Sequence, residues 1–494
     1  MFESAALHHE IPKDEYEREV AQLRTALLHA QMALRDKAPF AVLVLIAGVE
    51  GAGKGETVNL LNEWMDPRFI EVSGFALPTD EEAARPPMWR FWRALPPKGR
   101  IGIFFGAWHT APIVERVAGR LGAGAYQRRI DEIVQMERML HDEGVLLLKY
   151  WFHITRKDQR KRLKVLEKDP ATAWRVSKMD WKLYRHYDDF FAVTEPFLRV
   201  TSTAEAPWLI VPGAEPRYRS LLVGRHLLEA LEARLASGAA PPPATPDVPM
   251  PPALDKLNIL RSLRLDRKLD KPDYARRLET WQGRLATLSR DAKFAKRSVV
   301  AVFEGNDAAG KGGAVRRVTA ALDARRLKVV PVAAPTEEER AQPYMWRFWR
   351  HIPPPGFLTI FDRSWYGRVL VERVEGFCAP PDWQRAYAEI NEFEAQLVES
   401  RVVLAKFWLA ISNAEQLRRF QEREATPFKR HKITPEDWRN REKWDAYEQA
   451  VCDMVDRTST AQAPWTLVEA NNKYYARLKV LRTLVESIER AFDA

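Results

Sequence analysis

Two glycine-rich segments that end in lysine are the residues of this chain best suited to chemistry. One reads Gly-Asn-Asp-Ala-Ala-Gly-Lys from Gly305 to Lys311, and the other reads Gly-Val-Glu-Gly-Ala-Gly-Lys from Gly48 to Lys54. Glycines let backbone N–H groups approach phosphate oxygens closely, and the lysine adds a positive charge. Each segment follows an apolar run, so the pattern predicts two phosphate-binding loops between a strand and a helix.

The second loop departs from the common pattern at its last position. Ser or Thr usually follows the lysine and holds magnesium, but here Gly312 stands there. Asp307, inside the loop, is expected to replace the missing hydroxyl as a Mg²⁺ anchor or as a base. We predict that Gly305, Gly310 and Gly312 bind phosphate through the backbone. A chance glycine turn before a helix is the alternative interpretation.

A charged stretch, Asp362-Arg363-Ser364-Trp365-Tyr366-Gly367-Arg368, follows another apolar run. A carboxylate at the end of a strand is the usual second magnesium anchor of phosphate-loop enzymes. The forked guanidinium groups of Arg363 and Arg368 suit phosphate oxygens. We therefore predict a catalytic group of Asp307, Lys311, Asp362, Arg363 and Arg368, with Asp307 and Asp362 as the metal ligands. The alternative is a strand-end aspartate that pairs only with a neighbouring arginine.

Basic residues downstream are predicted to complete the phosphate site. Residues 418–423 and 428–432 are expected to form a helical lid that excludes water, although a solvated helix face is the alternative. Lys406 lies within an apolar run, where it could either extend outward or face the phosphates. The residues assigned to phosphate binding in this part of the chain are Lys406, Arg419, Arg423, Lys429, Arg430 and Lys432.

The chain is a tandem duplication. Lys54 and Lys311 stand 257 positions apart, and the same offset relates Met88–Arg93 to Met345–Arg350 and Ala206–Trp208 to Ala463–Trp465. A Pro/Ala-rich stretch at 236–254 is predicted to be a linker. It separates a domain at 1–235 from a domain at 255–494. The repeated aromatic and basic stretch at 344–350 is expected to pack at a domain or subunit junction, with stacking on a base or an oligonucleotide as the alternative.

The first copy lacks the charges of the second. With the 257 offset, Asp362 corresponds to Phe105, Arg363 to Gly106 and Arg368 to Ala111. Phenylalanine cannot bind magnesium, and the side chains of glycine and alanine cannot bind phosphate. The domain at 1–235 is therefore predicted to be non-catalytic, although Gly53 and Lys54 could still bind an anion weakly. The domain at 255–494 is predicted to be catalytic.

The elements that must position these residues alternate between strands and helices. Strands are predicted at 299–303, 327–332, 357–361, 401–409 and 465–469, and helices at 312–322 and 383–400. In the latter, Tyr387, Ile390, Phe393 and Leu397 share one side. The fold class is therefore α/β, with two phosphate-loop kinase-like domains that each contain a mostly parallel sheet flanked by helices. Ligands of such sheets lie beyond the carboxyl ends of the strands.

Composition limits the function classes. The chain has 494 residues, 46% hydrophobic and 29% charged, which is ordinary for a globular protein. Its two cysteines imply neither a disulfide framework nor a zinc site, so a cytoplasmic protein is expected. No apolar stretch reaches the length of a membrane span. The net charge of +10 and pI near 9.4 favour an anionic partner, with nucleic acid, acidic lipid and polyphosphate as candidates.

These motifs together resemble the polyphosphate kinase 2 family. The resemblance rests on the loop Phe303–Gly313, the stretch Asp362–Arg368 and the basic lid, and in that family glycine at the position of Gly312 is normal. It covers 255–494 strongly and 16–235 as a diverged copy. The fused pair with a degenerate first half resembles the AMP-phosphorylating branch of the family.

The resemblance implies transfer of the terminal phosphoryl group of inorganic polyphosphate to AMP, giving ADP, with Mg²⁺ and with GMP as a weaker acceptor. The expected partners are polyphosphate and AMP or ADP, without nucleic acid or membrane. A homo-oligomer is possible, and if related single-copy proteins pair about a two-fold axis, the two halves could form that pair within one chain as an internal pseudo-dimer. Two other functions remain open: an ATP-dependent nucleoside or nucleotide kinase, and a non-catalytic basic module that binds nucleic acid.

Overall fold

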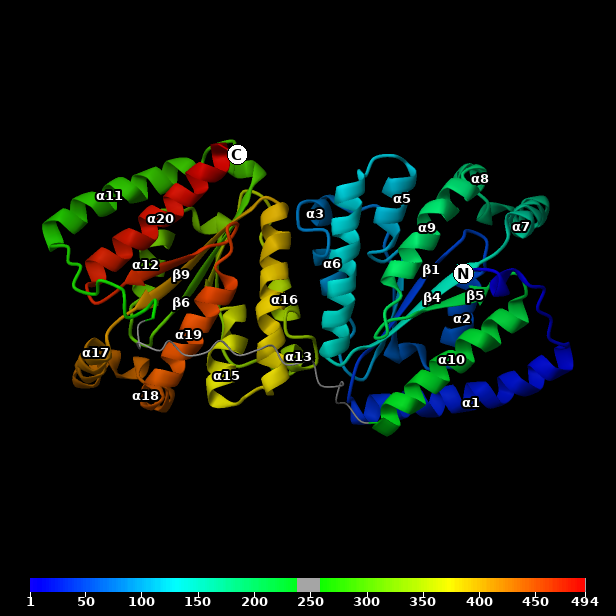
Figure 1. The fold of residues 1–494 in the computed structure, drawn as a ribbon, viewed down its shortest axis with the longest axis horizontal. Helices are drawn as coiled ribbons and strands as arrows, with labels where there is room; N and C mark the ends of the chain where they lie inside the picture. Colours follow the sequence, from blue (N-terminus) through cyan, green and yellow to red (C-terminus); the bar gives the residue numbers. More distant parts are fainter. Residues whose placement is uncertain (238–257, 494) are drawn as a thin grey trace. The chain divides into compact units, whose positions relative to one another are not determined.

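The computed structural model of the chain describes residues 1–237 and 258–493, apart from the side chains of Met179, Lys429 and Lys432. These residues form two compact units (Figure 1). The first unit consists mainly of 1–78 and 90–237, and the second mainly of 258–335 and 347–493; 79–89 group with the second unit and 336–346 with the first. Most of the predicted linker, 238–254, lies outside the described residues, so the domain boundaries stay a prediction.

Each unit is built on a five-stranded parallel sheet, and the two sheets have the same strand order. The first sheet has the order β2-β3-β1-β4-β5 and the second β7-β8-β6-β9-β10. The strands of the first sheet are β1 (Val42–Gly48), β2 (Ile70–Gly74), β3 (Ile101–Phe105), β4 (Leu146–His153) and β5 (Trp208–Pro212). Those of the second are β6 (Ser298–Gly305), β7 (Leu327–Pro331), β8 (Leu358–Asp362), β9 (Val402–Ala410) and β10 (Trp465–Glu469).

Helices cover both faces of each sheet. The helices of the first half of the sequence are α1 (Lys13–Lys37), α2 (Lys54–Trp64), α3 (Asp80–Ala83), α4 (Trp89–Ala94), α5 (Thr110–Val117), α6 (Ala123–Asp142), α7 (Arg156–Lys168), α8 (Lys178–Arg185), α9 (Tyr187–Thr201) and α10 (Pro216–Ser237). The second half contributes α11 (Lys271–Leu288), α12 (Lys311–Thr319), α13 (Glu337–Arg340), α14 (Trp346–Trp349), α15 (Val371–Glu375), α16 (Pro380–Glu399), α17 (Asn413–Ala425), α18 (Pro435–Glu442), α19 (Trp444–Thr458) and α20 (Lys473–Asp493).

Short 3-10 turns connect several of these elements. They are η1 (Ser4–Ala6), η2 (Pro67–Phe69), η3 (Ala173–Arg175), η4 (Phe294–Lys296), η5 (Ala324–Arg326), η6 (Trp365–Val369) and η7 (Pro427–Lys432). The predicted elements are confirmed, with ends that differ by a few residues. The α/β fold class with tandem parallel sheets is therefore confirmed.

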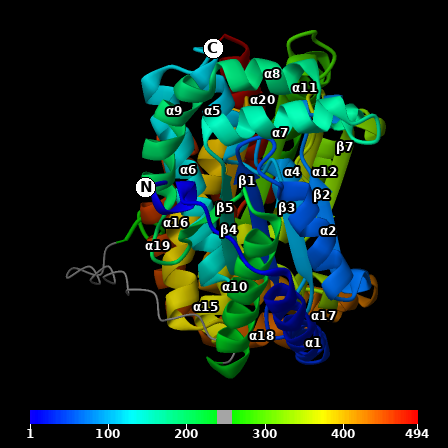
Figure 2. The same ribbon diagram turned by 90° about the vertical axis from the view of Figure 1, so that its right-hand side faces the viewer.

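The apolar faces of the helices explain how the layers form. In the second unit, α11, α12 and α20 pack with β6 and β9 in one core, and α16 lies on the opposite face of the sheet (Figure 1). The predicted apolar side of α16, with Ile390 and Phe393, is buried. In the first unit, α1 and α10 run side by side over the corresponding face (Figure 2). Within the described residues, no helix is long and apolar enough to cross a membrane.

The parallel register brings the predicted site residues to one edge of the second sheet. Phe303 on β6 pairs with Asp362 on β8, so the phosphate loop after Gly305 and the carboxylate at the end of β8 start from neighbouring strand ends. The predicted location of the ligand site, beyond the carboxyl ends of the strands, follows from this register.

Candidate active site

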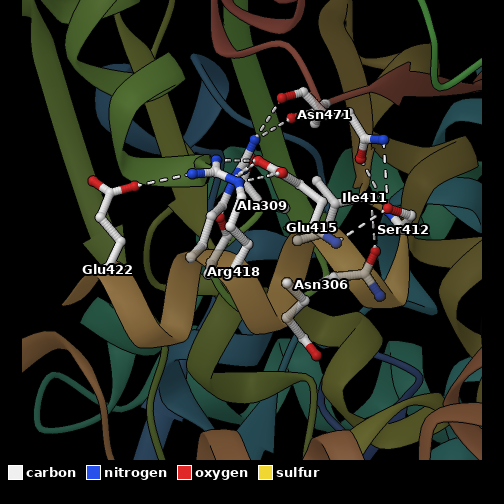
Figure 3. Close-up of polar contacts among 12 residues, drawn as sticks. Asn306, Ala309, Ile411, Ser412, Glu415, Arg418, Glu422 and Asn471 are labelled. Carbon is white, nitrogen blue, oxygen red and sulfur yellow. Dashed lines mark hydrogen bonds and ion pairs between the residues drawn. The ribbon is translucent and has the colours of Figure 1, made fainter. Parts of the chain in front are cut away.

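Backbone geometry explains the glycine that begins the second phosphate loop. Gly305 has φ +148°, and a Cβ atom at this residue would lie 2.5 Å from the carbonyl oxygen of Leu409. Only glycine allows this approach between the loop and β9. The Asn306 side chain then fixes the loop, because its Oδ1 accepts a hydrogen bond of 3.1 Å from the backbone N–H of Ile411 (Figure 3). The loop ends at Lys311, the first residue of α12.

Arg419 on α17 holds the phosphate loop through hydrogen bonds to its backbone carbonyl oxygens. One terminal nitrogen donates to the carbonyl oxygens of Ala308 and Ala309, and the other to those of Ala470 and Asn471. The remaining N–H donates to Glu415 at 2.6 Å. Ala309, Glu415 and Asn471 are labelled in this network in Figure 3. All five N–H groups of the guanidinium are thus engaged, and the side chain is 3% exposed.

Asp307 is positioned by two neighbours from other elements. Asn440 on α18 donates to its Oδ2 at 2.9 Å, and the Arg363 guanidinium lies 3.5 Å from its Oδ1. The Asp307 side chain is 14% exposed. Its carboxylate therefore connects the loop both to the end of β8 and to the helix that follows the predicted lid segment 428–432.

Arg363 adopts a left-handed backbone conformation with φ +64° immediately after β8. This region is unfavourable for residues other than glycine, at a cost of about 1 kcal/mol, and such residues concentrate at functional sites. Partial burial disfavours charge on the guanidinium, but the nearby carboxylates of Asp307 and Glu304 raise the pKa of Arg363. The turn thus directs a firmly cationic group into the site at a cost in backbone energy.

A cleft of about 660 Å³ opens above the loop. Asp307 and Asp362 both line it, together with the loop backbone from Ala308 to Gly312. Its cationic lining residues are Lys311, Arg316, Arg317, Arg363, Arg419, Arg423, Lys473 and Arg477. Four acidic residues, Asp307, Asp362, Glu422 and Asp437, also line it, so the cleft as a whole has an excess of positive charge.

Four of these cations were not predicted from the sequence. Arg316 and Arg317 come from the last turns of α12, and Lys473 and Arg477 from the start of α20. The adjacent Arg316-Arg317 pair, close behind the loop, was a signal that could have been used. Lys473 and Arg477 carry no such local signal, because only the strand order brings the start of α20 next to the loop.

Other predicted residues lie outside the cleft. Lys406 is 1% exposed, and its Nζ donates to Glu394, the Tyr366 hydroxyl and the Thr458 carbonyl oxygen. It therefore neither extends into solvent nor faces the phosphate loop, because a buried carboxylate holds it inside the domain. Arg368 on η6 pairs with Glu372 at 3.0 Å and does not line the cleft.

The two predicted lid segments lie on α17, at 418–423, and on η7, at 428–432. Arg423 on α17 lines the cleft, whereas Arg430 is exposed and donates to the Glu424 carbonyl oxygen at 2.8 Å. The side chains of Lys429 and Lys432 lie outside the described residues. Lid closure over the cleft accordingly stays a prediction.

The aromatic and basic stretch is divided between the units, because 344–346 group with the first unit and 347–350 with the second. Phe348 packs against Trp365 with ring centroids 5.9 Å apart, and Trp349 packs edge-on against Phe393 at 4.8 Å. Trp365 in turn lies close behind Asp362 and Arg363 in the sequence. These residues are buried, so their role here is packing beneath the strand end.

The first unit reproduces the loop without the charges. Gly106 follows β3 with φ +65°, as Arg363 follows β8, and a Cβ atom there would lie 2.6 Å from the Phe75 carbonyl oxygen. Lys54 donates to Glu50 and to the Gly48 carbonyl oxygen, both at 2.9 Å. No carboxylate stands at the end of β3, where Phe105 occupies the position of Asp362.

A guanidinium also holds the first loop, but it comes from another helix. Arg219 on α10 donates to the carbonyl oxygens of Gly213 and Ala52 and is 1% exposed. By the 257 offset these carbonyls correspond to those of Ala470 and Ala309, which Arg419 binds in the second unit. Arg162, the counterpart of Arg419, instead pairs with Glu56.

Comparison with known proteins identifies the family. The model of the family described as polyphosphate kinase 2 (PPK2) matches residues 10–238 and again 268–493. The chain belongs to the polyphosphate kinase 2 family. The two matched segments correspond to the two copies that the 257 offset relates, so both copies are recognisable members of this family.

Relatives match over the whole length. A polyphosphate:AMP phosphotransferase of Pseudomonas aeruginosa is 59% identical over 100% of this chain and 99% of its own length. One of Acinetobacter johnsonii is 37% identical over 96% of this chain and 97% of its own. A crystal structure of a P. aeruginosa protein assigned as polyphosphate kinase 2 superposes with a TM-score of 0.90 and 56% identity, covering 100% of this chain and 99% of that one.

Proposed function

We propose that this chain transfers the terminal phosphoryl group of inorganic polyphosphate to AMP, giving ADP, with GMP as a weaker acceptor. One observation carries the proposal: Asp307, Lys311, Asp362 and Arg363 line a single basic cleft over a phosphate loop. Full-length similarity to proteins named polyphosphate:AMP phosphotransferase supports the choice of donor and acceptor.

The cleft suits a linear polyanion as donor. Its cations come from α12, α17, α20 and the end of β8, so they surround the loop rather than form one point of charge. A chain of phosphates can be bound by several of them at once, with Lys311 and the loop N–H groups at the reacting end. We assign Arg316, Arg317, Arg423, Lys473 and Arg477 to the donor chain beyond that end.

Two carboxylates suit magnesium at this site. Mg²⁺ typically binds one or two carboxylates together with substrate phosphates and water, and Asp307 and Asp362 both line the cleft over the loop. Among the described residues, no three His, Cys, Asp or Glu side chains converge on a metal position, which agrees with a site completed by phosphate oxygens. When bound there, Mg²⁺ neutralises charge on the transferred group.

The transfer step needs positioning and charge neutralisation more than covalent catalysis. An oxygen of the AMP phosphate attacks the terminal phosphorus of the donor, the bond to the bridging oxygen breaks, and the shortened chain departs with that oxygen. We assign Arg363 to the transferred or accepting phosphate, because its guanidinium is held beside Asp307. Asp307 orients the accepting oxygen through the same contact network.

We propose different roles for two of the predicted phosphate ligands, Arg419 and Lys406. Arg419 positions the loop, since all its donors are engaged there, and Lys406 stabilises the core. Arg430, with Lys429 and Lys432, is assigned to lid closure over the donor. Arg368 keeps its predicted role as a phosphate clamp only if it releases Glu372 when substrate binds.

Donor preference tests the proposal directly. The full chain is incubated with AMP, polyphosphate and Mg²⁺ without ATP, and the products are resolved by chromatography. ADP should form from AMP, more slowly GDP from GMP, and removal of Mg²⁺ by a chelator should stop both. ADP formation only when ATP is supplied would identify an ATP-dependent kinase instead. Tight, salt-dependent nucleic-acid binding with no turnover would favour the non-catalytic module.

A further inference from the structure

The first unit contains a cavity of about 360 Å³ at the carboxyl edge of its sheet. The second unit has a pocket of about 90 Å³ at the same place, beside the cleft. Each residue that lines the smaller pocket has a counterpart 257 positions earlier that lines the larger cavity. The cavity is therefore the enlarged equivalent of a pocket next to the phosphate loop of the second copy.

Substitutions for smaller and apolar residues account for the enlargement. Arg363 is replaced by Gly106 and Glu304 by Ala47, which removes two long charged side chains. Asn440 is replaced by Leu183, so the wall formed by the helix before α9 becomes apolar. Further aromatic and aliphatic walls come from Phe105, Ile113, Val114, Val117, Trp151 and Phe190.

The cavity offers little net charge to a ligand. Among the described residues that line it, the acidic and the lysine or arginine residues are Glu50 and Lys54, which pair with each other at 2.9 Å. Lys54 also donates to the Gly48 carbonyl oxygen. An ammonium engaged by a carboxylate and a carbonyl has little attraction left for phosphate, and no arginine lines the cavity.

A buried polar atom in the wall lacks a partner. Gln159 is 2% exposed, and its Nε2 donates to the Glu50 carbonyl oxygen at 3.0 Å. Its Oε1 accepts no hydrogen bond from the described residues. In the second unit, Oε1 of the corresponding Gln416 accepts from Arg441 at 3.1 Å. Such an atom in a native protein calls for a water or ligand donor.

We propose that this cavity binds an uncharged, flat heteroaromatic molecule of the nucleobase or nucleoside class. Its volume lies at the lower end of the range of about 300–1,000 Å³ found for small-molecule sites, and apolar walls with few polar groups are their usual lining. The aromatic rings of Phe105, Trp151 and Phe190 provide stacking surfaces. An exocyclic amino group on the ligand supplies the donor that Gln159 Oε1 lacks.

This site is distinct from the phosphoryl-transfer site and does not rest on the proposed function. The second unit concentrates guanidinium groups and carboxylates where the first has glycine and phenylalanine. A phosphorylated nucleotide would bring about two negative charges to a cavity whose single ammonium is already paired. The base alone fits the lining chemistry, so the unphosphorylated form should bind better than the monophosphate.

A matched pair of variants tests the proposal with the full chain. Val114→Trp places a large ring at the cavity of the first unit, and Val371→Trp places the same ring at the corresponding pocket of the second. Binding of adenosine, guanosine and AMP is measured by calorimetry without polyphosphate. We expect one adenosine or guanosine site per chain, at least tenfold weakened by Val114→Trp and unchanged by Val371→Trp. Far-UV circular dichroism and a thermal unfolding transition that match those of the unchanged chain confirm that Val114→Trp is folded.

Three results would overturn the proposal. One is the absence of detectable binding of either nucleoside at millimolar concentration. Another is binding that survives Val114→Trp but is lost in Val371→Trp, which would place the nucleoside in the second unit. The third is a Val114→Trp-sensitive site that prefers AMP over adenosine, which would mean that the cavity recognises phosphate. Each result is independent of whether polyphosphate is the donor.

Discussion

The two copies share a buried lysine–glutamate pair but differ at the carboxyl edge of the sheet. Lys406 donates to Glu394 at 2.6 Å inside the second unit, and Lys149 donates to Glu137 at 2.6 Å inside the first. Each ammonium also donates to a backbone carbonyl oxygen, of Thr458 or of Thr201. At the carboxyl edge, by contrast, Asp362 and Arg363 of the second copy correspond to Phe105 and Gly106 of the first.

This difference separates the residues that both copies share from those that we propose for catalysis in the second copy alone. The buried ion pair, the strand order and the glycines of the loop persist in a copy that lost its strand-end charges. In both copies a guanidinium holds the loop, but α17 provides it in the second copy and α10 in the first. The loop backbone is therefore held in place in both copies, whereas charged side chains stand at the strand end in the second copy only.

The largest expected effect is a loss of stability when the buried lysine–glutamate pair that both copies share is broken. Lys406→Met leaves the buried Glu394 carboxylate without its cation, and so should lower the free energy of unfolding by about 3–5 kcal/mol. Lys149→Met should cost a similar amount through Glu137. Denaturant unfolding measures both. The double variant Lys406→Met/Glu394→Gln should recover part of the loss. A stable Lys406→Met variant that had lost only polyphosphate affinity would return Lys406 to the phosphate site.

The next effect concerns the strand-end charge. Asp362→Asn should reduce turnover of AMP with polyphosphate at least hundredfold, because a neutral amide is a poor magnesium ligand and the residue lies over the loop. Thermal unfolding should be nearly unchanged, since the side chain is not in the core. The matched first-copy variant Phe105→Leu should keep normal turnover. Near-normal activity of Asp362→Asn would refute the assignment of the second copy as catalytic.

A smaller effect is expected at Arg363, whose backbone is left-handed: stability should rise while activity falls. Arg363→Gly removes the unfavourable backbone conformation, so the free energy of unfolding should rise by up to about 1 kcal/mol while turnover falls about ten- to hundredfold. In the first copy, Gly106→Ala should lower stability by about 1 kcal/mol or more, because its Cβ atom would meet the Phe75 carbonyl oxygen. Parallel losses of stability and activity in Arg363→Gly would contradict this account.

The smallest effect is predicted for the surviving lysine of the first copy. Lys54→Ala should change turnover by no more than about twofold, because its ammonium is paired with Glu50 and no carboxylate stands beside it at the strand end. Steady-state kinetics with AMP and polyphosphate measure this. A thousandfold loss would show that the first copy takes part in catalysis.

Much of the fold could be predicted from the sequence because the signals are local and repeated. Apolar runs gave the strands, the Gly-x4-Gly-Lys pattern gave the loop, and Asp362 was found because it ends such a run. The cations Lys473 and Arg477 could not be predicted, since only the position of β10 beside β9 brings the start of α20 to the loop. For the same reason, the sequence could not tell that Arg419 serves the loop backbone.

Gly106, which follows β3, also bears on whether a charged site could be built in the first copy. Its bare Cα lets the Phe75 carbonyl oxygen occupy the space that a side chain would need, only 2.6 Å from the would-be Cβ atom. Placing an arginine there would require the backbone near Phe75 to move, and an aspartate in place of Phe105 would enter an apolar wall. A charged site could therefore not be built in the first copy by one substitution at a time, because the surroundings of both positions would have to change as well.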